Sequence, residues 1–415
     1  MERLLGFSPS LLDRQTRRNF DLDASSALFI GVFSAIINPF VQVVAIHLGA
    51  SNTAIGLIAA APYLGALVSF YWGQVSHGRA KLPFVVWPNL IGRLTLLLVA
   101  FTHAPWVYAT IILLYNFVVA VPAPAYGGLM EKIYPAAYRG RLLAAIRVFM
   151  GFSFAAVSYF AGKALDVFGH GVLFPIGVAF GVTSILIFSG VTEPAAAPGS
   201  EQPAEERPAR FMAVLRTDRL FVTYLAGFMV FGAANLFVLP LYAVFQVRVL
   251  HLSYAQVALL SLAWAVAWLV GYRVWGLVAD RARPSIVLIA AVLGYALAPL
   301  AYTLAHGLGP LLLASALIGL ADAGLDVGWL AEVMRLAGAK TSTYYGIHLT
   351  LMGLRGAVAP FIATSLLSVV SVRTLLAVGS GTMFLGLIPF LIADRAPALS
   401  NGPGRSIKWP GTAKN

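Results

Sequence analysis

The sequence contains no cysteine and few charged residues. Asp, Glu, Lys and Arg together make up 11% of its 415 residues, whereas hydrophobic residues make up 60%. The absence of cysteine excludes a disulfide framework, a thiolate metal site and a cysteine nucleophile. About a quarter of the residues in a soluble domain are charged. The composition therefore excludes an ordinary soluble enzyme, because a soluble fold could not hide so much apolar surface from water. It also excludes a disordered protein, because disordered chains have low hydrophobicity.

Common enzyme motifs are absent as well. The sequence has no HExxH zinc motif, no GxSxG nucleophile motif and no P-loop. Ala339-Lys340-Thr341 lacks the glycine directly before the lysine that a phosphate cradle needs. We therefore expect a protein that is not an enzyme, needs no metal or other cofactor and does not use ATP.

The sequence does contain long apolar stretches, such as residues 285–302 and 374–393. A helix needs about 20 apolar residues to span a membrane, whereas the strands of a membrane barrel have about 10 with alternating polarity. The stretches predict an all-α polytopic membrane protein. Charged or Gly- and Pro-rich breaks divide it into twelve predicted transmembrane helices, at residues 24–47, 53–74, 83–102, 105–129, 141–165, 171–192, 218–247, 253–279, 285–305, 309–333, 343–369 and 374–394.

The longest interruption is the polar, proline-rich segment 193–217, which we expect to be mobile. It separates two sets of six helices. The predicted domains are a cytoplasmic N-terminal tail (1–23), an N-terminal six-helix bundle (24–192), a cytoplasmic central loop (193–217), a C-terminal six-helix bundle (218–394) and a cytoplasmic C-terminal tail (395–415).

Basic residues indicate the orientation of these helices. With the N-terminus inside, 21 of the 28 Lys and Arg residues lie in cytoplasmic loops and tails, and only Arg248 and Arg373 lie outside. Cytoplasmic loops carry an excess of Lys and Arg, so both termini are predicted to be cytoplasmic. This distribution explains the net charge of +12 without a nucleic-acid partner. Arg outnumbers Lys 22 to 6, which favours a GC-rich prokaryotic source and therefore an inner membrane.

Two loops are alike. The loop after the second predicted helix contains Gly73, His77, Arg79 and Lys81, and the loop after the eighth contains Gly276, Asp280, Arg281 and Arg283. A glycine at such a helix end is expected to let a neighbouring helix pack closely. The second loop resembles the signature loop of the major facilitator superfamily, G-x-x-x-D-R-x-x-[RK], although His77 stands at the Asp position of the first copy.

With the division into six and six helices, this resemblance covers about residues 20–395. It implies two pseudo-symmetric bundles that rock around a solute site at the middle of the membrane, with helices 1, 4, 7 and 10 lining the cavity. It also implies that Asp280 takes part in a charge relay between the halves. Because His77 carries no permanent negative charge, the two loops are expected to be functionally unequal.

Ionisable residues inside membrane helices are functional candidates because they are costly to bury. Asp322 and Asp326 in the tenth helix are four residues apart and share one face, whereas Gly324 and Gly328 lie on the opposite face, which is predicted to pack. The carboxylates form either a proton or cation site or a structural ion pair with a nearby arginine. Two such close carboxylates favour proton binding by at least one.

Three further ionisable side chains lie in the fifth and eleventh predicted helices. Arg355 is near the middle of the eleventh, and we predict that it either pairs with a carboxylate of the tenth helix or clamps an anion. His348 on the same stripe is either a packing residue or part of the site. Arg147 in the fifth helix is predicted to snorkel, to pair with Glu131 or to meet the solute.

Aromatic and neutral polar residues complete the candidates. Trp264, Trp268 and Tyr272 form one stripe of the eighth helix, which either packs or stacks against the solute. Neutral polar residues at the depth of the cavity can orient a ligand in a mostly apolar pocket. These candidates are Asn38, Gln42, Tyr115, Asn116 and Asn235.

The leading hypothesis is a secondary active transporter that moves a small solute, together with protons, by alternating access. The alternatives are an uncoupled facilitator or exporter, and a transporter-like receptor, scramblase or assembly factor without solute flux. Several arginines beside a carboxylate pair favour an anionic or zwitterionic solute. We expect a monomer embedded in the lipid bilayer.

Overall fold

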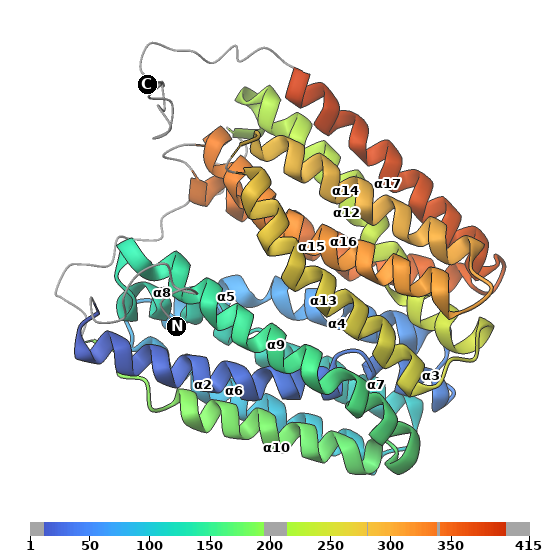
Figure 1. The fold of residues 1–415 in the computed structure, drawn as a ribbon, viewed down its shortest axis with the longest axis horizontal. Helices are drawn as coiled ribbons and strands as arrows, with labels where there is room; N and C mark the ends of the chain where they lie inside the picture. The colour runs from blue at the N-terminus through green and yellow to red at the C-terminus, as the bar shows by residue number, and fades with distance from the viewer. Residues whose placement is uncertain (1–11, 195–213, 280, 338–340, 396–415) are drawn as a thin grey trace.

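The computed structural model describes residues 12–194, 214–279, 281–337 and 341–395. Within these ranges every regular element is a helix (Figure 1). Eleven helical stretches in the described residues are long and apolar enough to cross a membrane, and a further apolar helix, Asn52–Leu67, is shorter. The prediction of an all-α polytopic membrane protein is confirmed, and the expected count of twelve helices differs only at this short one.

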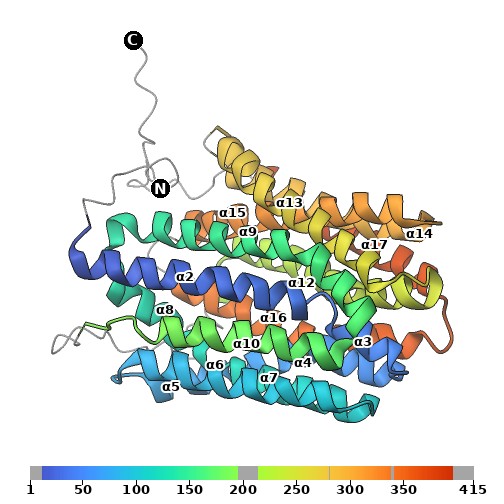
Figure 2. The ribbon, with the colours of Figure 1, turned by 60° about the horizontal axis from the view of Figure 1, so that its bottom comes forward.

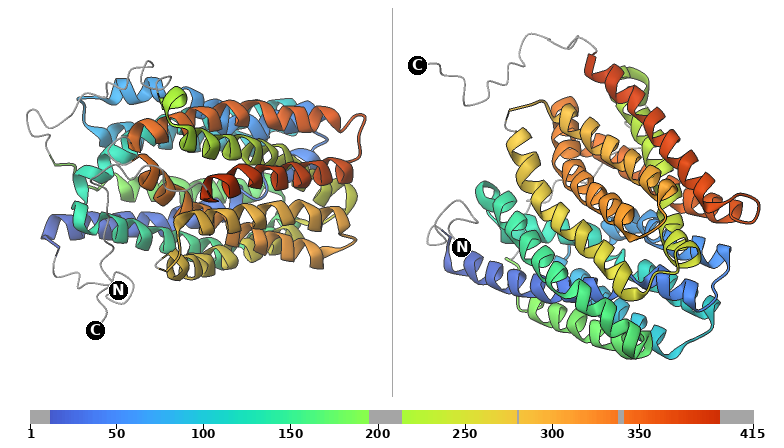
Figure 3. Two further views of the ribbon diagram at one scale, coloured as in Figure 1. Left: turned by 90° about the horizontal axis from the view of Figure 1, so that it is seen from above. Right: turned by 45° about the vertical axis from the view of Figure 1, so that its right-hand side comes forward.

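The helices form two groups that follow the two halves of the chain, coloured blue to green and yellow-green to red in Figure 3. The first half contains α2 (Arg14–Ile37), α3 (Val41–His47), α4 (Asn52–Leu67), α5 (Ser69–Ser76), α6 (Lys81–Leu97), η2 (Leu98–Phe101), α7 (Pro105–Val119), α8 (Pro122–Ile133), α9 (Ala136–Phe168) and α10 (His170–Phe188). The second half contains α12 (Arg219–Val244), the π-helix η3 (Phe245–Val249), α13 (Tyr254–Ala279), α14 (Pro284–Leu304), α15 (Leu308–Ala337), α16 (Thr341–Leu366) and α17 (Val372–Arg395).

Several predicted spans are interrupted helices. The first is divided into α2 and α3 around Pro39, and the fourth into α7 and α8 just before Pro122. Proline lacks an N–H donor and its ring clashes with the preceding turn, so it ends or kinks a helix. The second predicted span is divided at Val68. Neither α4 nor α5 alone has the roughly 20 residues of a full span.

Helix α2 begins at Arg14, well before the predicted start at residue 24, because Asp13 caps it. The Asp13 side chain accepts hydrogen bonds from the backbone N–H groups of Gln15 and Thr16, both at 2.9 Å. Such a cap satisfies donors that lack a partner within the helix. Residues 14–23, predicted as part of the tail, are therefore the first turns of α2.

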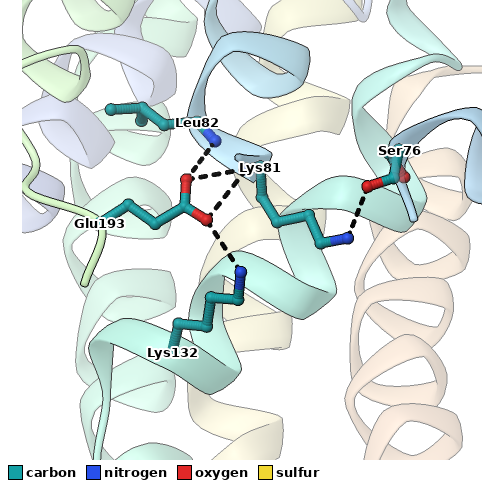
Figure 4. A network of polar contacts seen from close by, with 5 residues as sticks. All are labelled: Ser76, Lys81, Leu82, Lys132 and Glu193. Atoms are coloured by element: carbon teal, nitrogen blue, oxygen red, sulfur yellow. Dashed lines mark hydrogen bonds and ion pairs between the residues drawn. The ribbon is translucent and has the colours of Figure 1, made fainter. Parts of the chain in front are cut away.

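Glu193, predicted to start the mobile central loop, is instead bonded to the first half of the chain (Figure 4). Its carboxylate accepts hydrogen bonds from the backbone N–H of Lys81 and Leu82, each at 2.8 Å, and from Lys132 Nζ at 3.1 Å. The Lys81 ammonium donates to the Ser76 carbonyl at 2.7 Å. Burial alone would raise the pKa of Glu193, but these hydrogen bonds outweigh it and hold the pKa below its ordinary value. Most of segment 193–217 lies outside the described residues.

A similar contact occurs in the second half. Asp394 near the end of α17 accepts a hydrogen bond from Ser285 Oγ, in the first turn of α14, at 2.5 Å. In each half, a carboxylate thus meets the start of the third predicted helix: Asp394 from the end of α17, and Glu193 from the segment that follows α10. This agreement supports the internal repeat that the two loops suggested.

The glycines of those loops do not bring helices close together. A Cβ added at Gly73 would meet only Pro124, at 3.6 Å, and one at Gly276 would meet nothing within 4 Å. The expected close packing at these positions is wrong. His77, Arg79, Arg281 and Arg283 are exposed, and Asp280 lies outside the described residues.

The two halves pack against each other through α9 with α13 and through α4 with α16 (Figure 2). At the end of the molecule opposite to the start of α2, the side chain of Asp166 accepts hydrogen bonds from the backbone N–H of Tyr254 and Ala255, each at 2.9 Å. At the same end, Arg248 donates to Asn52 Oδ1 at 2.7 Å. We call this the opposite end. Here the halves are joined by direct polar contacts.

Candidate functional site

A cavity of about 600 Å³ lies between the two halves. Its wall in the first half includes Asn38, Gln42, Tyr63, Tyr115, Asn116 and Phe154. Its wall in the second half includes Tyr242, Gln246, Ser261, Trp264, Tyr302 and Ser315. The cavity has the size of a small-molecule site.

The wall of the cavity contains no Asp, Glu, Lys, Arg or His among the described residues that line it. Its polar groups are amides and hydroxyls, and much of the remaining surface is aromatic. Such a wall can hydrogen-bond a polar solute and cover its flat or apolar faces. It has no charge to neutralise an ion, so it does not match the anionic or zwitterionic solute that the sequence favoured.

Breaks in the helices bring polar residues to the cavity. Asn38 ends α2 and Gln42 follows in α3, on either side of the interruption at Pro39. In the second half Gln246 lies in the π-helix η3, and its Nε2 donates to the Tyr302 hydroxyl at 2.8 Å. Short π-helical segments occur frequently at functional sites. Gln246 and Tyr302 are site residues that the sequence analysis missed. Gln246 is one of two amides in the apolar stretch 218–247, and only the other, Asn235, was named as a candidate.

Asp322 lies directly behind the cavity wall. Its Oδ2 accepts a hydrogen bond from the indole Nε1 of Trp264 at 2.6 Å, and its Oδ1 accepts one from the Tyr295 hydroxyl. Gly324 and Gly328 pack against α13 and α14: an added Cβ at Gly324 would lie 2.9 Å from Trp275 Nε1, and one at Gly328 would lie 3.1 Å from the Leu288 backbone. The predicted packing role of these two glycines is confirmed.

Asp326 has a different environment from Asp322. It accepts a hydrogen bond from the Tyr272 hydroxyl at 2.5 Å and forms an ion pair of 3.5 Å with Arg147 of α9. The side chains of Arg147 and Asp326 are 56% and 44% exposed, so water screens the pair. Of the three alternatives for Arg147, the pairing with Glu131 is wrong, because the Arg147 guanidinium pairs with Asp326 and thereby connects the two halves of the protein.

Arg355 does not pair with a carboxylate of α15 in the described residues. Its Nη1 donates to the backbone carbonyl of Phe228, and its guanidinium lies against Gly232 of α12. The buried Nε has no hydrogen-bond partner. The predicted pairing with Asp322 or Asp326 is wrong, because the Arg355 side chain is directed to α12 rather than to α15.

The remaining candidates are mostly packing residues. His348 is 6% exposed and packs its ring against Trp329 and Phe228, with ring centres 4.0 and 4.8 Å away. Trp268 stacks on Trp264 at 5.8 Å and packs against α9 at Gly151. Trp268, Tyr272 and Asn235 do not line the cavity. Of the aromatic stripe, only Trp264 reaches it.

Comparison with known proteins identifies the family of this chain. The model of the Major Facilitator Superfamily matches residues 24–273, which is more than half of the chain. No curated protein sequence matches this chain.

Solved structures of transporters have the same fold. A single-residue variant of the nucleoside transporter NupG superposes with a TM-score of 0.74 at 13% identity, covering 91% of this chain and 99% of that one. A bacterial homologue of the human lysosomal transporter Spinster, inward-facing and occupied, gives a TM-score of 0.66 at 14% identity, covering 92% of this chain and 96% of that one. This chain is therefore a multi-pass integral membrane transporter, not an enzyme, and belongs to the Major Facilitator Superfamily.

Proposed function

We propose that this protein is a secondary active transporter for a neutral, polar solute with a flat or apolar face, and that a proton bound at Asp322 drives the transport. The observation that supports the solute class is the uncharged wall of the cavity, built from amides, hydroxyls and aromatic rings of both halves. An ion in this cavity would lose its hydration without gaining a counter-charge. A neutral solute loses less and regains hydrogen bonds from the wall.

The contacts between the halves support alternating access with the opposite end closed. Asp166 and Arg248 join the halves at that end. If both termini are cytoplasmic, as the basic loops predict, this conformation is closed to the outside. Single cysteines at Ser51 and Ser200, in a chain without natural cysteine, test the orientation. An impermeant thiol reagent should label only Ser51→Cys in whole cells, and labelling of Ser200→Cys would reverse the assignment.

The environment of Asp322 supports proton coupling. In the described residues it accepts hydrogen bonds from Trp264 and Tyr295 but forms no ion pair. A carboxylate without a cation partner is costly inside the membrane, and a second carboxylate nearby favours protonation. The titratable groups that interact with it from neighbouring elements are Tyr63 on α4, Tyr242 on α12, Tyr295 on α14 and Asp326 on α15, with Arg355 on α16 beside Tyr63.

Uptake into proteoliposomes with an imposed pH gradient tests both parts of the proposal. We choose uridine as the first neutral probe, because one similar structure is described as a nucleoside transporter. Glucose and succinate serve as a second neutral solute and an anion. We expect accumulation of a neutral probe and not of succinate. Accumulation of succinate alone would refute the proposed solute class.

The coupling is tested with Asp322→Asn. This variant should lose accumulation driven by the pH gradient but keep counterflow exchange, which needs no net proton movement. Asp326→Asn is the matched control on the same helix, because Asp326 is hydrogen-bonded and paired with Arg147. Normal accumulation by Asp322→Asn would favour an uncoupled facilitator or exporter. No flux of any probe through the wild-type protein would favour a receptor or scramblase.

A further inference from the structure

Trp264 contacts three parts of the protein that must act together in transport. Its side chain lines the cavity. Its indole N–H donates to Asp322 at 2.6 Å. Its ring also meets Phe154 of α9 in the other half, edge to face, with ring centres 5.7 Å apart. No other side chain of the described cavity wall is hydrogen-bonded to Asp322.

The position of the Trp264 ring is fixed from two sides. Trp268, one turn further along α13, stacks on it with an interplanar angle of 14°. The backbone of Trp264 lies against Gly319 of α15, where an added Cβ would collide with it. Gly319 precedes Asp322 by one helical turn, so the close approach of α13 and α15 holds the indole in reach of the carboxylate.

We propose that Trp264 is a positioning residue that couples occupation of the cavity to protonation of Asp322. This inference rests on the proposed function and deepens it. An indole has one N–H donor and no acceptor, so the same N–H cannot serve both the carboxylate and a hydrogen-bond acceptor of the solute equally well.

The direction of the coupling follows from the strength of the bond. A hydrogen bond to a charged carboxylate is about twice as strong as one to a neutral group. A solute that accepts the hydrogen bond of the indole N–H takes this donor away from Asp322. Binding of the solute therefore costs more free energy when Asp322 is charged than when it is protonated. Solute and proton consequently favour each other's binding, and by thermodynamic reciprocity each raises the affinity for the other by the same factor. This cooperativity is what a symporter requires.

The experiment uses the full-length protein in detergent and follows the carboxylic C=O band of Asp322 by infrared difference spectroscopy as the pH changes. Asp322→Asn identifies the band by removing it. Trp264→Phe keeps an aromatic ring in the wall but deletes the donor. We expect this variant to be half-protonated at a pH about one unit higher, a tenfold gain in proton affinity, because the charged form loses a donor.

Trp268→Phe is the matched control. Trp268 neither lines the cavity nor donates to Asp322, and phenylalanine at this position keeps an aromatic ring to stack on Trp264. This control should leave the midpoint of the band unchanged. An unchanged midpoint in Trp264→Phe, with a monodisperse protein and the band still present, would overturn the proposal. So would an equal shift in both variants, which would indicate a general effect of packing.

Addition of uridine separates this inference from the proposed function. In the wild-type protein, saturating uridine should move the midpoint to higher pH, and in Trp264→Phe it should not. If counterflow shows that uridine is transported but it moves the midpoint equally in both proteins, the coupling role of Trp264 is refuted. If uridine, glucose and succinate all lack transport while Trp264→Phe still shifts the midpoint, the proposed transport function fails and the control of Asp322 by Trp264 stands.

Discussion

The hydrogen bonds of Asp166 predict how firmly the opposite end of the molecule is closed. Asp166, near the end of α9, accepts hydrogen bonds from the first two backbone N–H groups of α13, in the other half of the protein. These donors have no partner within α13. A transporter that opens at this end must break both bonds. Asp166→Ala removes these two hydrogen bonds from the closed conformation. The open conformation lacks them already, so its free energy should not change.

The magnitude follows from the type of contact. Deleting a side chain that caps a helix N-terminus costs about 1 kcal/mol, and Asp166 is exposed, so water moderates its charge. A shift of about 1 kcal/mol changes the ratio of two conformations roughly fivefold. We therefore expect Asp166→Ala to raise the population that is open at this end about fivefold, with the helices intact.

Pulsed electron spin resonance measures this population directly. Spin labels at Ala104→Cys and Val369→Cys report the distance between the halves at the opposite end, and the chain has no other cysteine. Asp21→Ala is the control, because it removes an exposed carboxylate at the far end of the protein. If Asp166→Ala gives the same distance distribution as the control, these bonds do not hold the halves together and the reasoning is wrong.

Other contacts give further expectations. Glu193→Gln should lower Tm by roughly 1–2 °C at pH 7. Hydrogen bonds hold the folded pKa of Glu193 below its ordinary value, so the full loss should be seen above that ordinary value, about 4.3, and should shrink as the pH falls from there through the folded pKa. A loss that is equal at pH 7 and pH 3.5 in differential scanning fluorimetry would contradict this. Arg147 and Asp326 are about half exposed. A double-mutant cycle of Arg147→Gln and Asp326→Asn, measured as the free energy of unfolding, should therefore give a coupling energy below about 1 kcal/mol. A larger value would indicate a desolvated ion pair. Gly162→Leu places a side chain where a Cβ would already collide with Ala258 across the halves, so it should lengthen the spin-label distance at the opposite end, and an unchanged distance would mean that the contact is not tight.

The membrane-spanning character and the division into halves could be predicted because each depends on local composition. In a bilayer every backbone polar group must be satisfied within its own helix, so a run of about 20 apolar residues almost dictates a spanning helix. The exceptions occur at particular residues. Pro39 interrupts the first span, and Asp13 extends it toward the N-terminus by capping. Both are local effects that the hydropathy pattern does not register.

The candidate site could be predicted only in part, because a sequence places side chains on their own helix but not against a neighbour. Asn38, Gln42, Tyr115 and Asn116 line the cavity as their depth along the helices suggested, and Trp264 lines it in agreement with one of the two alternatives for the aromatic stripe. Arg355 was expected to meet a carboxylate of α15, but its side chain is directed to the Phe228 carbonyl on α12. Depth in the membrane is readable from sequence, whereas the rotation of a helix and the identity of its neighbours are not.

The two aspartates of α15 show the same division between sequence and tertiary structure. By itself the sequence determined that Asp322 and Asp326 lie about 6 Å apart along the axis and within about 40° around it, because helical geometry is fixed. Only the packing of α9, α13 and α14 decided that the first is held by Trp264 and Tyr295 behind the cavity and the second is paired with Arg147 in a half-exposed contact. Those partners are distant in sequence, and their approach depends on how whole helices pack, which no local pattern encodes.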